Sequence, residues 1–266
     1  MSMLLIAIVL GIVEGLTEFL PISSTGHLIV ANALMGFEGE RAEVYTIFIQ
    51  LGAILSVVWE FRVRLFKVVA DLPRRREARG FSFNLFLAFL PAAVIGLLVH
   101  DYISEHLFSS ITVAWALIAG AVLILVVESL PLKPRTTVAE NVSWKQALGI
   151  GFAQCLALWP GFSRSAATIL GGLGLGLNRK AATEFSFFLA IPVMFAATIY
   201  DLLKNFEYLE ASDAGWLSLS FVISFLVAWV SIRWLLRYVA SHSFRMFAWY
   251  RIALGVLILG SSLGYG

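Results

Sequence analysis

Two glutamates lie four residues apart within the first apolar segment of the chain. On a helix, Glu14 and Glu18 would share one face. Carboxylates inside an apolar segment are energetically costly, so such residues are functional candidates by default. The alternatives are a pair of glutamates near the outer surface or a structural hydrogen-bond network, and we favour the functional interpretation.

A polar cluster follows these glutamates directly and consists of Ser23, Ser24, Thr25 and His27. If a helix begins near Ser24, its hydroxyl and the His27 ring lie about one turn apart. That spacing suits a nucleophile and its general base. The serines alone are more simply helix N-caps, and His27 alone an interior histidine. Together they favour catalysis, with Ser24 as the nucleophile, Ser23 as the cap, and attack by water with His27 as base as the alternative mechanism.

The second half of the chain contains a related cluster centred on Arg164. An arginine buried at the start of a helix needs an anion, and its planar fork suits phosphate. An ion pair with Glu14 or Glu18 would also satisfy it, but an ion pair would not need the neighbouring hydroxyls. We therefore favour phosphate. The predicted substrate contacts are Arg164, Ser163, Ser165, Ser23 and Thr25.

Several other classes of site are excluded by the sequence. It contains no Gly-Lys-Ser/Thr phosphate loop and no Gly-x-Ser-x-Gly elbow. No two of its four histidines are spaced as metal ligands with cysteines that could complete the site. Because Cys155 is the single cysteine, no intramolecular disulfide can form. The net charge of +2 is too small to indicate a nucleic-acid partner.

The composition indicates which elements must position these residues. Of 266 residues, 60% are hydrophobic and only 14% are charged, against roughly a quarter charged in soluble domains. The excess of apolar surface needs a bilayer. We therefore expect an all-α, polytopic membrane helix bundle that forms one integral membrane domain over residues 1–266.

Six segments are long and apolar enough to span a ~30 Å hydrocarbon core. They are 45–61, 83–99, 112–130, 184–202, 216–236 and 247–264. Segment 62–79 carries seven basic residues and is predicted to be cytoplasmic, whereas segment 100–111 has no Lys or Arg and is predicted outside. Continuing this alternation places the acidic loop 203–215 and both termini outside.

Residues 3–36 and 146–178 do not fit as simple spans. Each is an apolar helix that is broken by Pro21 or Pro160 and is followed by a short second helix. We predict two re-entrant hairpins, whose breaks must be buried in protein or line a wet cavity. A constant offset of 140 residues aligns Gly11 with Gly151 and Ser23 with Ser163. The basic loops give the two halves opposite orientations, so we expect inverted repeats over approximately 3–130 and 143–264, with the site where the broken helices meet.

The two motifs resemble those of a known family. The stretches from Glu14 to His27 (EGLTEFLPISSTGH) and from Pro160 to Ile169 (PGFSRSAATI) are similar to the signature motifs of the undecaprenyl-diphosphate phosphatases, the bacitracin-resistance proteins. The similarity extends over nearly the whole chain. Ala166, where the family often has glycine, is the one departure at a motif position.

The resemblance implies a polyprenyl lipid substrate and a bacterial inner membrane location. The family hydrolyses undecaprenyl diphosphate to undecaprenyl phosphate, recycles the carrier lipid for peptidoglycan and uses a divalent cation, Mg²⁺ or Ca²⁺. Its functional residues fall here on Glu14, Glu18, Ser24, His27 and Arg164. We expect Glu14 or Glu18 to be the metal ligand, and their individual roles stay open. We expect the active site to face the periplasm, because the first hairpin enters from that side. Membrane lipids are the other partners, and a homodimer is one option for the oligomeric state.

Three rival classes of protein share some of these features. The type 2 phosphatidic acid phosphatases need a histidine six residues after the arginine, where this chain has Leu170. A transporter that flips the polyprenyl-phosphate lipid is the stronger rival, because inverted repeats with broken helices are typical of transporters. A purely structural membrane protein does not account for costly polar residues gathered at two helix breaks.

Overall fold

The protein is a bundle of helices. The computed structural model describes residues 2–204, 207 and 213–263, and no β-sheet is present in these ranges. The first half contains α1 (Met3–Thr17), α2 (Ser24–Met35), α3 (Glu40–Glu60), α4 (Arg62–Asp71), α5 (Arg76–Leu98), α6 (His100–His106) and α7 (Ser110–Ser129). The second half contains η1 (Ala139–Asn141), α8 (Trp144–Gln154), η2 (Cys155–Leu158), α9 (Arg164–Gly174), α10 (Arg179–Lys204), α11 (Ala214–Tyr238) and α12 (Arg245–Leu263). The predicted all-α class is confirmed.

Five of the described helices, α3, α5, α7, α10 and α11, are long and apolar enough to cross a membrane. They overlap the first five predicted spans, and several begin five to seven residues earlier than predicted, so the chain is a multi-pass membrane protein. The sixth predicted span, 247–264, forms α12 but is not among those five. Residue 264 and most of loop 203–215 lie outside the described residues. The numbers of spans and re-entrant hairpins stay predictions.

The two proline-containing breaks have the same local geometry. The caps of α2 and α9 are Ser23, with φ 72° and ψ 102°, and Ser163, with φ 78° and ψ 114°. Among the described residues, these are the only ones other than glycine with positive φ. Gly36 and Gly176 end the segments that follow, also with positive φ. Both pairs lie at the offset of 140 residues seen in the sequence.

The helices that lead into the breaks pack closely on a neighbour. Helix α1 lies against α11, and α8 lies against α5. A Cβ at Gly11 would come within 2.7 Å of the Ser220 carbonyl oxygen, and one at Gly151 within 2.6 Å of the Ala88 carbonyl oxygen. Only glycine permits this approach, so these two positions hold each entry helix against its support.

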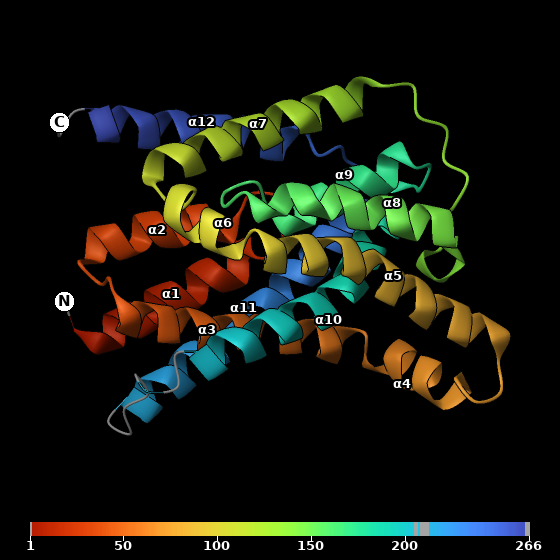
Figure 1. Ribbon diagram of the computed structural model, residues 1–266, viewed down its shortest axis with the longest axis horizontal. Coiled ribbons are helices and arrows are strands. Elements are labelled where there is room, and N and C mark those ends of the chain that lie inside the picture. The colour runs from red at the N-terminus through yellow and green to blue at the C-terminus, as the bar shows by residue number, and fades with distance from the viewer. Residues whose placement is uncertain (1, 205–206, 208–212, 264–266) are drawn as a thin grey trace.

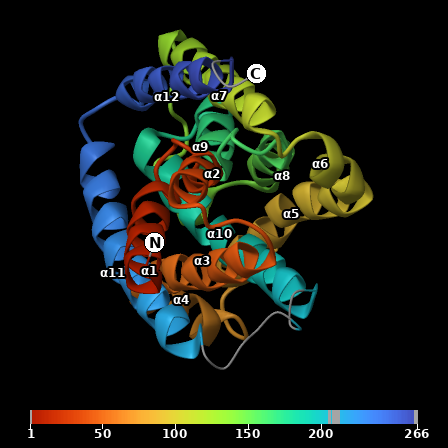
Figure 2. The same ribbon diagram turned by 90° about the vertical axis from the view of Figure 1, so that its left-hand side faces the viewer.

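The two ends of the bundle differ in what they carry. Both chain termini lie at one end, whereas α4 and the segment that joins α7 to α8 lie at the other (Figure 1). Viewed from the end with the termini, α2 lies near the centre and α11 and α12 lie at the rim (Figure 2). The start of α2 is inside the bundle, since Ser24, Gly26 and Leu28 are buried, whereas its last turn reaches the surface.

Candidate active site

The two helix breaks touch one another. The Ser165 hydroxyl, which is fully buried, donates to the carbonyl oxygen of Leu20 at 2.9 Å. Ser165 also lies 3.0 Å, oxygen to oxygen, from the Ser163 hydroxyl. The residues that follow each break are therefore brought together, although 140 positions separate the two serine caps.

Glu18 connects the two breaks chemically. The Ser24 hydroxyl donates to Glu18 Oε2 at 2.5 Å, and Arg164 Nη2 donates to Glu18 Oε1 at 2.9 Å. The side chains of Arg164 and Glu18 are only 13% and 9% exposed. One carboxylate thus faces a hydroxyl and a guanidinium at once. This arrangement can take a proton from Ser24 while the positive charge nearby favours an anionic ligand.

Arg164 is held by groups besides Glu18. Its Nη1 donates to the Ser186 carbonyl oxygen at 3.2 Å, and its guanidinium carbon lies 5.7 Å from the centre of the Phe19 ring. The Ser186 hydroxyl is in turn 2.6 Å from Thr168 Oγ1. These contacts fix the direction of the guanidinium, which is what a phosphate clamp requires.

His27 lies beside the site but has other partners than Ser24. Its Nδ1 lies 2.7 Å from the Ser23 carbonyl oxygen, which can only accept, so Nδ1 carries the proton. Nε2 then accepts from the Tyr250 hydroxyl at 2.7 Å. The sequence paired His27 with Ser24, but the structure places Glu18 on that hydroxyl. A catalytic role for His27 stays a prediction.

Glu14 is a carboxylate in an unusual environment. It is fully buried, and neither oxygen has a hydrogen-bond partner among the described residues. It lies one helical turn before Glu18 on α1. No cluster of three or more His, Cys, Asp or Glu residues occurs within the described ranges. However, Mg²⁺ is commonly held by one or two carboxylates together with substrate phosphates, so unsatisfied Glu14 oxygens fit such an ion.

Two of the remaining predicted substrate contacts, Ser23 and Ser163, also cap a helix. The Ser23 and Ser163 hydroxyls accept from the backbone N–H groups of Gly26 at 3.5 Å and Ala166 at 3.2 Å. Both serines are therefore N-caps as well as predicted substrate contacts. Thr25 is half-buried on the first turn of α2.

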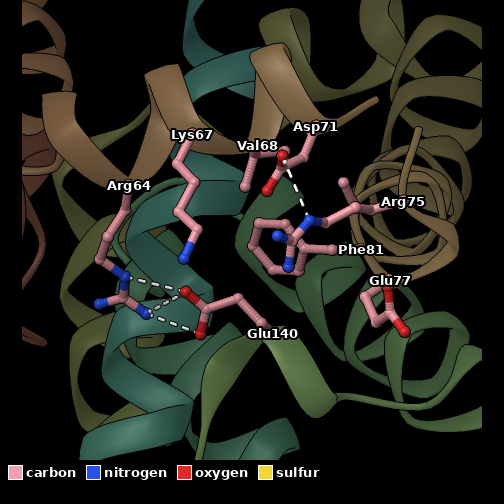
Figure 3. Close-up of a pocket in the computed structure, with 9 residues that line it drawn as sticks. Arg64, Lys67, Val68, Asp71, Arg75, Glu77, Phe81 and Glu140 are labelled. Carbon is pink, nitrogen blue, oxygen red and sulfur yellow. Dashed lines mark hydrogen bonds and ion pairs between the residues drawn. The ribbon is translucent and has the colours of Figure 1, made fainter. Parts of the chain in front are cut away.

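A separate group of charged residues surrounds a cavity of about 360 Å³ at the end of the bundle that carries α4. Figure 3 shows Arg64 and Lys67 of α4 pointing toward Glu140. Arg64 binds Glu140 and also Glu184, at 2.7 Å and 2.9 Å. None of the predicted site residues lines this cavity. Arg75 lies 3.4 Å from Asp71, which also lines the cavity, and Arg64 acts as a structural tie between α4, η1 and α10.

Tyr250 and Arg251 are site neighbours that the sequence analysis missed. Tyr250 contacts His27, and Arg251 contacts the backbone of both breaks. Both belong to α12, more than 80 residues from the nearest break. The arginine stood within an apolar segment, and an ionisable residue there could have been singled out on cost alone.

Comparison with known proteins adds the context of a family. A family model described as bacitracin resistance protein BacA matches residues 7–257. A Nitrosospira multiformis protein described as undecaprenyl-diphosphatase is 56% identical over 257 residues, which is 97% of this chain and 94% of that protein. Proteins of the same description from Ectopseudomonas mendocina and Nitrosomonas europaea are 55% and 54% identical, over 96% of this chain and 92% and 93% of their own lengths.

Proposed function

The chain belongs to the bacitracin resistance protein BacA family, and we propose that the cluster of Glu18, Ser24 and Arg164 is the site of its activity. It is an undecaprenyl-diphosphate phosphatase, a membrane hydrolase that releases inorganic phosphate and regenerates the lipid carrier for cell-wall synthesis. The observation that carries the site assignment is the 2.5 Å hydrogen bond from Ser24 to Glu18, whose other oxygen binds Arg164.

Ser24 is the proposed nucleophile. Its Oγ attacks the terminal phosphorus while Glu18, already in contact with the hydroxyl, takes the proton. The bond from this phosphorus to the bridging anhydride oxygen breaks, and undecaprenyl phosphate leaves with the electron pair. Water then attacks the phosphorus of the phosphoserine, the bond from phosphorus to Ser24 Oγ breaks, and Oγ takes the proton held by Glu18 while inorganic phosphate leaves. In the competing mechanism, water attacks the diphosphate directly and His27 is the base.

Arg164 neutralises the anion that must form. The oxygens of a phosphate repel an incoming nucleophile, so catalysis depends on positive charge and fixed donors. The guanidinium enters from the second break, and the N-terminus of α9 directs N–H groups to the same region. Glu18 holds Arg164 in place until the substrate arrives.

A divalent cation is part of this proposal. Glu14, with both carboxylate oxygens unsatisfied, would hold it together with the substrate's phosphates, whereas both Glu18 oxygens already bind Ser24 and Arg164. When bound, the ion would withdraw charge from the phosphoryl oxygens. Glu14 itself is buried and needs a cation or a proton.

The proposed location is the bacterial inner membrane, with the site open to the periplasm. The basic segment 62–79 supports this orientation, because positive loops stay in the cytoplasm. A membrane-impermeant molecule that sequesters the diphosphate should block turnover in intact cells. Inhibition only in inverted vesicles would show that the site faces the cytoplasm instead. The homodimer is kept as a proposal that the mass of the detergent-purified protein can test.

The function is tested with purified protein in detergent, where there are no two compartments to transport between. We expect it to release phosphate from a C55 diphosphate and to lose activity when EDTA removes divalent ions. No release in detergent, combined with movement of the polyprenyl phosphate across liposomes, would identify a flippase instead. The names of the relatives favour the phosphatase.

A further inference from the structure

Arg251 is a fully buried cation with unusual partners. Its side chain lies inside the bundle at 0% exposure. No carboxylate within the described ranges lies in ion-pair contact with it. Desolvating a charge is expensive, and a buried cation normally has an anion beside it. Its place in the fold therefore needs an explanation.

Backbone carbonyl oxygens take the place of that anion. Nη1 donates to Pro21 at 3.2 Å, while Nη2 donates to Gly161 at 3.2 Å and to Phe162 at 2.8 Å. These carbonyls lie in the two helix breaks, where the helical hydrogen-bond pattern is interrupted. In a membrane, such orphaned groups must be satisfied by protein. One guanidinium thus binds both breaks.

The remaining contacts attach this clamp to α7. Nε donates to the Leu117 carbonyl oxygen at 3.1 Å, and Nη2 also approaches that of Ala116 at 3.2 Å. Gly120 provides the space, because a Cβ there would lie 2.1 Å from Arg251 Nη2. The guanidinium is therefore seated by α7 and reaches from that seat to both breaks.

We propose that Arg251 is a positioning residue for the phosphatase reaction, which sets the distance between Ser24 and Arg164. Ser24 follows Pro21 by three residues, and Arg164 follows Phe162 by two. Both capping serines hold backbone with positive φ, a conformation that persists only where the surrounding groups fix it. By binding the carbonyl oxygens of both breaks, Arg251 opposes a shift of one break relative to the other. This inference rests on the proposed site.

The test compares kcat and KM of Arg251→Lys, Arg251→Met and Gly120→Ala. Lysine has three donors without the planar fork, so it cannot reproduce five contacts. Gly120→Ala retains the arginine but displaces its guanidinium. We expect each variant to lower kcat by about 10²-fold, the usual effect of ~1 Å misplacement, with KM changed far less. Arg245→Met, on the same helix, is the matched control and should retain normal turnover.

A double variant separates positioning from folding. Once Arg251→Met removes the guanidinium, Gly120→Ala has nothing to displace and should add no further loss. Losses that simply multiply in the double variant would overturn the proposal. So would a lowered melting temperature with unchanged kcat in the folded fraction of Arg251→Lys and Gly120→Ala. If the wild-type protein itself releases no phosphate, the proposed function fails rather than this inference.

Discussion

The two helix breaks share a backbone conformation but differ in chemistry. The first continues from its capping serine with Ser24, and the second, at the corresponding position, with Arg164. Ahead of the caps, Glu14 corresponds to Gln154 and Glu18 to Leu158. The first break therefore supplies the proposed nucleophile and the two carboxylates, whereas the second supplies the guanidinium. The same backbone conformation thus presents two different sets of functional groups, and the proposed reaction needs both.

The division of roles has a physical advantage. A carboxylate beside a serine is a base, but it repels the diphosphate that the serine must attack. Arg164, which comes from the other break, compensates the negative charge of Glu18. Substitutions at corresponding positions should therefore have unequal effects, and the following experiments test this, from the largest effect to the smallest.

The largest effect is expected at the first break. Ser24→Ala removes only the reacting hydroxyl, so turnover should fall about 10³-fold or more while the protein still folds and binds lipid. Phosphate release is the measurement. Ser220→Ala is the control, because that buried serine only donates to the Leu217 carbonyl oxygen of its own helix. Near-normal turnover of Ser24→Ala, with an inactive His27→Ala, would show that water or His27 makes the attack.

The base should be nearly as sensitive. Glu18→Gln keeps the shape of the side chain but cannot take a proton, so kcat should fall by about 10²- to 10⁴-fold. Glu60→Gln serves as control, because Glu60 binds Trp229 and Arg233 away from the site. If Glu18→Gln keeps its turnover and His27→Ala does not, the proton goes to His27, as the sequence alone suggested.

At the second break, Arg164→Lys retains the charge but loses the two-pronged fork. We expect a loss of roughly 10²-fold in kcat, since fixed donors to the transition state typically contribute that much. Arg179→Lys is the control, because Arg179 also binds a carboxylate, that of Glu128, but its side chain is half-exposed and lies outside the site. A near-normal Arg164→Lys would mean that position 164 supplies only a structural charge.

Tyr250→Phe should have a smaller effect. It removes the hydroxyl that donates to His27 Nε2 at 2.7 Å and leaves the stacked ring in place. One hydrogen bond of about 1 kcal/mol corresponds to a roughly fivefold loss in kcat. Tyr238→Phe loses a hydrogen bond to the Ser243 carbonyl oxygen, away from the site, and should leave kcat unchanged. An equal effect of both would exclude a special role for the Tyr250 hydroxyl.

The smallest effect concerns what the breaks have in common. Positive φ costs a serine of order 1 kcal/mol, and glycine avoids that cost. Ser163→Ala loses the cap and keeps the strain, whereas Ser163→Gly loses both the cap and the strain. We expect the alanine variant to unfold at a lower temperature in detergent than the glycine variant. The glycine variant of Ser23 should likewise melt at a higher temperature than its alanine variant. Opposite orders at the two positions would show that the two breaks are not equivalent.

Much of this protein could be predicted from local patterns. Apolar length and charge content determine the membrane bundle, and prolines followed by serines determine where α2 and α9 begin. Glu18, Ser24 and Arg164 were found because polar groups in an apolar segment have a high cost. The structure brings these three together.

Packing decided which of these groups touch. The pairing of Ser24 with Glu18 rather than His27 depends on how the chain turns between Thr17 and Ser24, and no periodicity describes that turn. Tyr250 and Arg251 reach the breaks across 223 and 230 residues of chain. Contacts over such separations arise only when α12 packs on α7. The sequence alone determined the kinds of groups available, and tertiary packing decided their partners, because hydrogen bonds depend on final positions that local patterns do not contain.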